Sequence, residues 1–227
     1  MDYSRIWVVI AAFNEGAMIA EVIKEALVSF KNIVVVDDGS KDNTVQSALV
    51  AGATVLKHPV NLGQGAALQT GIDYAHQLGA SIIITFDADG QHRVQDAVLL
   101  AQAIDNDEAD IACGSRFLAI RSDTMPYSKK LTLKLAAWFT RLTSGVPVTD
   151  AHNGLRALSS EAASKIRITQ NRMAHASEII SEIKRYQLRF KEYPVEIIYT
   201  DYSIAKGQRI SNSINILIDL LFGRISK

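Results

Sequence analysis

Short apolar runs alternate along the first half of the chain with stretches in which apolar residues recur at helical spacing. An apolar run that ends at polar or glycine residues is typical of a buried strand. The predicted strands cover Ile6–Ala12 and residues 33–36, 54–56, 82–86 and 110–114, and the predicted helices cover 15–30, 44–51, 66–77 and 95–104. Strands that alternate with helices predict βαβ units, and therefore an α/β fold with a mostly parallel sheet and right-handed crossovers.

The pattern changes after Ser115. The later segments are predicted helices at 126–144, 172–186 and 211–225, short extended or irregular segments at 146–150 and 153–158, a final strand at 190–199 and a polar loop at 201–209. No internal repeat, low-complexity tract or long linker divides the chain. We therefore expect one domain over residues 1–210, followed by an amphipathic helix over 211–227 that faces a membrane or a partner.

Composition narrows the classes of function. Hydrophobic residues make up 48% of the 227, enough for a full core, and the formal net charge is zero, so no overall field attracts nucleic acid. The single cysteine, Cys113, excludes an internal disulfide, suits a reducing compartment and lies in an apolar run that predicts a core position. No signal-peptide pattern opens the sequence, and no stretch reaches the roughly 18 unbroken apolar residues of a membrane span. We expect a cytoplasmic protein, unless an amphipathic surface places it on a membrane.

The stretch IIITFDADGQH at 82–92 carries the strongest chemical signal. It runs from a predicted buried strand directly into Asp87 and Asp89, which places two carboxylates at the rim of a sheet, where ligands of open α/β sheets bind. Two such carboxylates can face one hard cation, such as Mg²⁺ or Mn²⁺, that also bridges to substrate phosphates. Gln91 and His92 can add a ligand or a phosphate contact. A solvated turn is the alternative, because Asp and Gly both favour turns.

Polar clusters follow several other predicted strands. They are Asn14-Glu15, Asp37-Asp38 and Ser115-Arg116. If the strands are parallel, these clusters and the Asp87 turn open on one edge of the sheet. Carboxylates after the second strand can accept hydrogen bonds from a ribose or a base, although turn and helix-cap roles explain them equally well. Gly63-x-Gly65 can present backbone N–H groups to an anion at a helix N-terminus, but a glycine turn before a helix is common for local reasons.

Motifs of several competing enzyme classes are absent from the sequence. The first strand is followed by AAFNEG, where a dinucleotide fold requires G-x-G-x-x-G. The P-loop motif, the H-E-x-x-H zinc motif and the G-x-S-x-G nucleophile elbow do not occur. The five histidines are scattered, which argues against a zinc site.

Taken in order, the motifs of the chain resemble those of the polyprenyl-phosphate sugar transferases, the dolichol-phosphate mannosyltransferase-like branch of the inverting glycosyltransferase family 2. The matching segments are AAFNE at 11–15, VVDDGSKDNT at 35–44, NLGQGAALQTG at 61–71, FDADGQH at 86–92, GSRF at 114–117, DAHNGLRAL at 150–158 and YTDYSIAKGQRISN at 199–212. The resemblance covers nearly all of the chain, and it is the ordered set that is specific. It implies the GT-A fold of nucleotide-diphospho-sugar transferases.

The resemblance also implies roles for individual residues. The set that it places on the nucleotide-sugar donor is Phe13, Glu15, Asp37, Asp38, Gly65, Ala88, Lys206 and Arg209, the last two in a C-terminal loop that closes over the diphosphate. The set that it places on Mg²⁺ or Mn²⁺ is Asp87, Asp89 and Gln91. Arg116 is implied to lie near the phosphates of donor or acceptor, and Asp150 on the acceptor side.

Three positions depart from the family's pattern. Ala11 stands where the family usually has Pro, and Phe13 where it often has Tyr, so we expect the nucleobase contacts to differ. Gln64 stands where the glycine loop often carries Lys or Arg. Many members also carry C-terminal membrane spans, which this sequence does not show, so the mode of membrane attachment is a separate question.

These expectations define a reaction. The resemblance implies transfer of a sugar from a nucleotide sugar, with UDP preferred over GDP, to a polyprenyl phosphate such as undecaprenyl phosphate, for cell-envelope polysaccharide or glycan modification. A phosphate acceptor is already anionic, so Asp150 need only orient it, and a single attack opposite the leaving group inverts the anomeric centre. One alternative is a saccharide hydroxyl as acceptor, with Asp150 as the base. Another is a non-catalytic nucleotide-sugar-binding subunit of a membrane complex.

Two predicted amphipathic helices suggest how a chain without a span reaches a lipid. The helix at 126–144 combines basic residues with Trp138 and Phe139, and the helix at 211–225 has a wide apolar stripe with basic flanks. Packing in the core or between subunits explains such helices equally well. We expect a peripheral protein on the inner face of the cell membrane, working as a homo-oligomer or with a small membrane-spanning partner.

Overall fold

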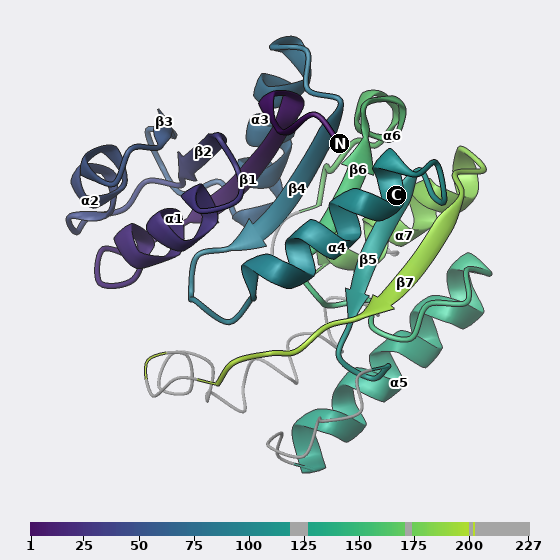
Figure 1. Ribbon diagram of the computed structural model, residues 1–227. Helices are drawn as coiled ribbons and strands as arrows, with labels where there is room; N and C mark the ends of the chain where they lie inside the picture. Colours follow the sequence, from purple (N-terminus) through teal and green to yellow (C-terminus); the bar gives the residue numbers. More distant parts are fainter. Residues whose placement is uncertain (119–126, 171–173, 200–201, 203–227) are drawn as a thin grey trace.

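The computed structural model describes residues 1–118, 127–170, 174–199 and 202 of the chain. They form a seven-stranded sheet in the order β3-β2-β1-β4-β6-β5-β7, with helices on both faces (Figure 1). The strands are β1 (Ile6–Ala12), β2 (Asn32–Asp37), β3 (Thr54–Lys57), β4 (Ile82–Asp87), β5 (Ile111–Ser115), β6 (Arg156–Ser159) and β7 (Phe190–Pro194). The α-helices are α1 (Ile19–Leu27), α2 (Thr44–Val50), α3 (Gln64–Gln77), α4 (Val94–Asp105), α5 (Tyr127–Ser144), α6 (Ser160–Lys165) and α7 (Ala174–Arg185).

The direction of the strands decides where the chain can build a site. β1, β2, β3 and β4 pair in parallel, and β5 pairs in parallel with β7. β6 lies between β4 and β5 and is antiparallel to both. The predicted mostly parallel α/β sheet is therefore confirmed. Because β6 runs in the opposite direction, the residues that precede it lie at the same edge of the sheet as the residues that follow β4 and β5.

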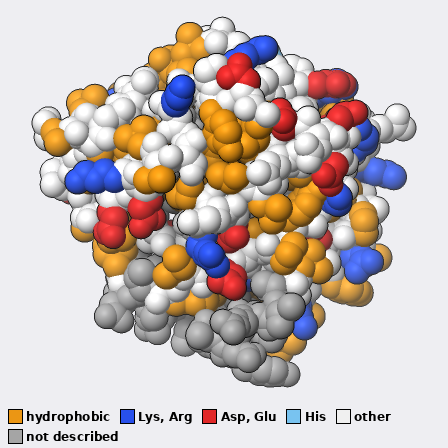
Figure 2. Space-filling view, in the orientation of Figure 1, with side chains coloured by type: hydrophobic (Ala, Val, Ile, Leu, Met, Phe, Trp, Pro, Cys, Tyr) orange, Lys and Arg blue, Asp and Glu red, His pale blue; other side chains and the backbone are white. Residues whose placement is uncertain are grey.

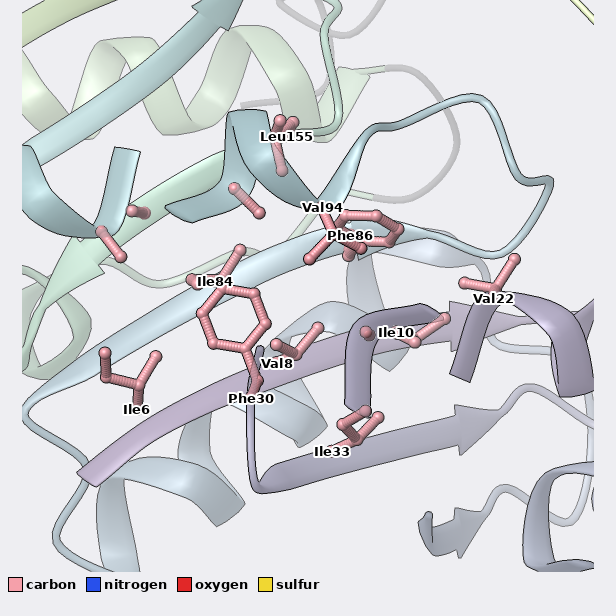
Figure 3. Packing of buried hydrophobic residues seen from close by; sticks show 14 of the residues in the cluster. Ile6, Val8, Ile10, Val22, Phe30, Ile33, Ile84, Phe86, Val94 and Leu155 are labelled. Atoms are coloured by element: carbon pink, nitrogen blue, oxygen red, sulfur yellow. The ribbon is translucent and has the colours of Figure 1, made fainter. Parts of the chain in front are cut away.

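The core consists of two apolar layers, one on each face of the sheet. Along β1, Val8 and Ile10 join the layer under α1, α2 and α4, while Val9 joins the layer under α3, α6 and α7. This alternation follows from the period of two along a strand. Figure 3 shows the first layer, where Phe30 packs beside Ile84 over the centre of the sheet. A sheet buried on both faces holds its strand ends rigidly, as a site at those ends requires.

Most elements of the first half agree with the sequence prediction. The first strand was predicted with its observed bounds, Ile6–Ala12, and Cys113 is buried as expected. The first helix starts four residues later than predicted, at Ile19, because Asn14 adopts a left-handed φ of 53° and a turn follows it. The strands predicted at 33–36, 54–56, 82–86 and 110–114 are all present, and each observed strand differs from the prediction by at most one residue at each end.

The second half agrees less well. The segment predicted as irregular or short extended at 153–158 contains β6, and the helix α6 that follows was not predicted. The final strand was predicted over 190–199 but ends at Pro194. The helix predicted at 211–225 lies outside the described residues, so that prediction and the domain boundary at 210 stay predictions. The predicted helix at 126–144 is present as α5.

The surface carries no sign of a strong overall field, in keeping with the zero net charge. On the described part of the face shown in Figure 2, acidic and basic side chains are interspersed with apolar ones. Among the described residues, no helix has the length and hydropathy that a bilayer crossing requires.

Candidate functional site at the carboxyl edge of the sheet

The loops after β1 and β2 are joined into one unit at the edge of the sheet. The backbone N–H of Asn14 donates to Ser40 Oγ at 2.8 Å, and Asn14 Oδ1 accepts from the N–H of Lys41 at 2.9 Å. The N–H of Glu15 donates to Thr44 Oγ1 at 2.8 Å. The predicted convergence of strand-end polar residues is therefore present here. The exposed Phe13 directly follows β1.

The two carboxylates of Asp37 and Asp38 have different surroundings. Asp38 accepts three hydrogen bonds, from His58 Nδ1 at 2.8 Å and from the N–H groups of Leu62 at 2.9 Å and Gly63 at 2.7 Å. Asp37 accepts one, from the N–H of Ser40 at 3.2 Å, and its Oδ1 is buried without a partner. Asp38 therefore holds the glycine loop in place, and Asp37 Oδ1 is the oxygen of this pair that a ligand can satisfy.

The glycine loop is shaped by close packing. The N–H of Gly63 is engaged by Asp38, so the idea that Gly63 presents it to an anion is not supported. A Cβ on Gly65 would lie 2.3 Å from the carbonyl oxygen of Gln170, so only glycine fits this approach of two backbones. Gly65 lies in the first turn of α3, where its placement on a diphosphate stays a prediction.

The Asp87 turn places its two carboxylates in different environments. Asp87 Oδ2 lies 2.8 Å from His92 Nε2, whose ring is buried edge-on against Phe86 with centroids 5.5 Å apart. Asp89 Oδ1 accepts from the N–H of Gln91 at 3.1 Å. His92 thus binds one oxygen of Asp87 and leaves Oδ1 for other contacts, the nearest described one being Gln64 Nε2 at 3.4 Å. His92 supports Asp87, whereas the sequence suggested a direct ligand or phosphate contact.

The pKa values of the two carboxyl groups are shifted in opposite directions. Burial raises the pKa of Asp87, but the nearby His92, Arg156 and His175 outweigh it and hold that pKa below its usual range. Burial and the negative charge of Asp87 raise the pKa of Asp89 to about 6. The turn therefore holds more negative charge than its surroundings balance, which is the condition that a bound cation relieves.

The donor set fits a divalent cation that takes part of its ligands from a substrate. Among the described residues, no group of three or more His, Cys, Asp or Glu side chains converges as a closed metal cage. The side chains of Asp87, Asp89 and Gln91, which all belong to this one turn, carry oxygen atoms that can be offered to such a cation. Mg²⁺ and Mn²⁺ sites with one or two carboxylates are completed by water and by substrate phosphates.

A buried ion pair forms the other side of the site. Arg116, just after β5, donates from Nε to Asp150 Oδ2 at 2.6 Å and from its backbone N–H to the same oxygen at 3.1 Å. Burial works to lower the pKa of the Arg116 guanidinium, but the Asp150 carboxylate holds it above its usual value, so Arg116 stays charged. Asp150 Oδ1 is buried and has no partner. Glu192 of β7 accepts from the N–H groups of Thr149 and Asp150, the latter at 3.0 Å, and fixes the backbone there.

The segment that leads into β6 joins the two sides. A Cβ on Gly154 would lie 2.3 Å from Asp87 Oδ2, so this glycine backbone rests directly against the carboxylate. Thr85 Oγ1 donates to the carbonyl of Gly154 at 2.7 Å, and Arg156 Nη2 donates to the carbonyl of Ala151 at 3.1 Å. The segment that carries Asp150 therefore reaches Asp87 through Gly154 at the edge of the sheet.

Several contributors to this site were not predicted. Arg156 is only 1% exposed, and a charged residue inside the apolar run LRAL was the signal that could have marked it. Glu192 had no local signal, because its role depends on pairing between β5 and β7. Tyr202 Oη donates to Glu15 Oε2 at 2.8 Å, which brings a residue from beyond β7 to the loop after β1. Lys206 and Arg209 lie outside the described residues, so their assignment to a closing loop stays a prediction.

Comparisons with known proteins agree with this geometry. The family model described as glycosyl transferase family 2 matches residues 7–167. The chain is 41% identical over 229 residues to an uncharacterized protein of Methanocaldococcus jannaschii, covering 99% of this chain and 94% of that protein. It is 34% identical over 243 residues to the UDP-N-acetylglucosamine–dolichyl-phosphate N-acetylglucosaminyltransferase of Methanococcus voltae, covering 98% of this chain and 97% of that one.

A solved structure shares the fold at low sequence identity. It is glucosyl-3-phosphoglycerate synthase from Mycobacterium tuberculosis in complex with Mn²⁺, uridine diphosphate and glucosyl-3-phosphoglycerate. The TM-score is 0.70 at 19% identity, with 96% of this chain and 79% of that chain covered. The likeness confirms the GT-A architecture that the motifs implied.

The contact between Gly154 and Asp87 can be tested. In Gly154→Ala the new methyl group displaces the Asp87 carboxylate, and we expect Mn²⁺ affinity to fall about tenfold or more, as it does when groups that orient a metal ligand are altered. Mn²⁺ titration followed by electron paramagnetic resonance measures this. Gly79→Ala is the control, because Gly79 has a left-handed φ of 80° but nothing within 4 Å of its would-be Cβ, so it strains the backbone away from the site. Equal Mn²⁺ affinity in both variants would contradict the assignment.

Proposed function

The chain belongs to glycosyltransferase family 2, in its polyprenyl-phosphate branch, and we propose that it transfers a sugar from a nucleotide sugar to a polyprenyl phosphate. One observation carries the proposal. The turn with Asp87 and Asp89 and the Arg116–Asp150 pair meet at one edge of the sheet, joined through Gly154. A donor diphosphate and an anionic acceptor need these two kinds of group side by side.

The donor side is proposed to hold the diphosphate through a divalent cation. Asp87, Asp89 and Gln91 would hold the cation through oxygen atoms, and a cation there would neutralise the charge that develops on the leaving nucleoside diphosphate. Glu15, Asp37 and the loop fixed by Asp38 hold the nucleoside, beside the exposed Phe13. Two findings favour a uridine nucleotide and Mn²⁺ or Mg²⁺: the donor in the name of the M. voltae relative, and the ligands in the M. tuberculosis structure.

The acceptor side is proposed to hold a phosphate that needs no proton removed. Arg116 stays charged and lies at the edge, where it can pair with an anionic oxygen. The acceptor oxygen attacks the anomeric carbon as the bond to the nucleoside diphosphate breaks and its electron pair leaves with the diphosphate. Attack from the opposite face inverts the anomeric centre. The names of two relatives support a lipid acceptor, since they contain dolichyl phosphate and polyprenol monophosphomannose.

Transfer of radiolabel from UDP-N-acetylglucosamine, UDP-glucose or GDP-mannose into undecaprenyl or dolichyl phosphate tests the proposal. Label in an organic-extractable, acid-labile lipid supports it. Label that appears only in a water-soluble saccharide favours the hydroxyl-acceptor alternative, in which Asp150→Asn should abolish turnover. Nucleotide-sugar binding without transfer to any acceptor favours the non-catalytic subunit.

The metal assignment gives a sharper expectation. Asp89→Ala should keep the fold and lower turnover by about 100-fold or more, because it removes a group that neutralises leaving-group charge. Initial rates and unfolding temperature are compared with those of Asp73→Ala, which removes a half-exposed carboxylate on α3. Full activity of Asp89→Ala, or wild-type activity undiminished in excess chelator, would refute the role of Asp87 and Asp89.

Helix α5 is proposed to bring the enzyme to its lipid. One face of α5 packs against the protein through Leu133, Ala136, Ala137 and Thr140. The other face carries Leu131, Leu135, Trp138 and Leu142, and each of these residues is 48 to 69% exposed. Lys134 lies 5.9 Å from the ring of Phe117, which directly follows Arg116, so the helix lies beside the acceptor side of the site (Figure 1). Apolar groups with basic neighbours favour an anionic membrane surface.

Vesicle flotation tests this membrane contact. The wild-type chain should float with anionic vesicles at low salt and less at high salt, and the double variant Trp138→Glu, Leu142→Glu should stay in the soluble fraction. The control is Val28→Glu with Val50→Glu, two equally polar changes at residues that are 86% and 78% exposed, just after α1 and at the end of α2. If the wild-type chain does not float but elutes as an oligomer that the α5 variant dissociates, the face is a subunit interface. The location on the inner face of the cell membrane also stays a prediction.

A further inference from the structure

Buried polar atoms without hydrogen-bond partners gather at one place in the described part of the chain. They include Asp150 Oδ1, both ring nitrogens of His152, Asn153 Nδ2 and Arg156 Nη1, with His92 Nδ1 in the turn after the neighbouring strand β4. Folded proteins satisfy nearly all buried polar groups, because each hydrogen bond left unmade destabilises the folded state. A concentration of such atoms in the segment 150–156 therefore indicates groups that a ligand satisfies.

His152 is the residue in this segment with both of its polar atoms unused. Its backbone is held firmly, since its carbonyl accepts from Arg116 Nη2 at 3.3 Å and the preceding carbonyl accepts from Arg156. Its ring makes no hydrogen bond with any residue that the structure describes. The fold thus fixes the position of an imidazole that contributes no hydrogen bond to stability.

The electrostatic environment keeps the ring uncharged. Burial lowers the pKa of His152 to about 4, and the positive charges of Arg156 and Arg116 act in the same direction against the opposing charge of Asp150. A neutral imidazole has one N–H donor and one lone-pair acceptor. That pair of functions matches hydroxyl groups, which both donate and accept, whereas a phosphate offers only acceptors and is better bound by Arg116.

The position of His152 matches the transferred sugar. Two residues before it, Asp150 binds Arg116 on the acceptor side, and two residues after it, Gly154 rests against Asp87 on the diphosphate side. The sugar must lie between the donor diphosphate and the attacking group. We propose that His152 hydrogen-bonds a hydroxyl group of the transferred sugar and thereby discriminates among donor sugars. The inference rests on the proposed function and identifies His152 as the residue that recognises the sugar.

Binding measurements with and without the sugar separate this role from others. Calorimetric titration in Mn²⁺ compares uridine diphosphate, UDP-glucose, UDP-galactose and UDP-N-acetylglucosamine on the wild type, His152→Leu and His152→Gln. We expect His152→Leu to bind uridine diphosphate as the wild type does but to lose about three- to tenfold in affinity for the preferred nucleotide sugar. His152→Gln keeps a donor and an acceptor and should recover part of that loss.

Each other outcome contradicts a different statement. An equal loss for uridine diphosphate and the nucleotide sugars would place His152 on the diphosphate or in the fold, and no loss for any ligand would remove it from the site. Removing an unpartnered buried imidazole should leave the unfolding temperature unchanged or raised, and His152→Gln still reports on the sugar if His152→Leu does not fold. A wild type that binds neither uridine nor guanosine diphosphates would instead overturn the proposed function itself.

Discussion

Negative charge buried at the carboxyl edge of the sheet is the constraint on which this structure depends. Asp150 is buried, and burial works to raise the pKa of Asp87 and of Glu192, so each of these carboxylates must be paired or hydrogen-bonded. Arg116 pairs with Asp150, and His92 contacts Asp87. The positive charge of the buried Arg156 also lowers the pKa of Asp87. Asp89 is left without an equivalent cation, and burial together with Asp87 raises its pKa to about 6. The negative charge of Asp89 is therefore not balanced as those of Asp87 and Asp150 are, and it lies where a cation and the phosphates of the donor are proposed to bind.

The antiparallel strand β6 makes that arrangement possible. A wholly parallel sheet brings only residues that follow strands to its carboxyl edge. Because β6 is inserted in the opposite direction between β4 and β5, the residues that precede it come to the same edge. Asp150, His152 and Gly154 therefore face residues that follow β4 and β5, and the backbone of Gly154 can touch Asp87. The two halves of the proposed reaction meet because one short strand runs against its neighbours.

Local pattern predicted the strand ends of the first half of the chain and missed much of the part around β6, for a physical reason. The strand at Ile6–Ala12 and the carboxylates at the end of β4 are encoded by apolar runs and the polar residues that stop them, so neighbouring residues suffice. β6 has four residues, and its partners β4 and β5 are remote in sequence, so no local period marks it. Glu192 acts through contacts between segments that are remote in sequence, and Arg156 acts on Asp87, which is also remote from it in sequence. The sequence suggested His92 as a ligand, whereas in the folded chain its ring contacts Asp87. The family resemblance named Asp150 and Arg116, but their direct ion pair is a property of the folded chain.

The pairing of Asp150 with Arg116 bears on the choice of acceptor. A general base must keep an oxygen free to take a proton and lie where the acceptor's hydroxyl approaches. Here Asp150 Oδ2 accepts twice from Arg116, and Oδ1 is buried beside groups that are themselves unsatisfied. An acceptor phosphate needs no base, because it arrives as an anion, and it gains directly from the guanidinium that Asp150 orients. Because Lys134 of α5 lies over the ring of Phe117, the residue after Arg116, the proposed membrane contact of α5 would let a lipid whose phosphate reaches Arg116 keep its hydrocarbon chain in the membrane. In the proposed reaction Asp150 is the counter-charge that keeps Arg116 in place before the acceptor arrives.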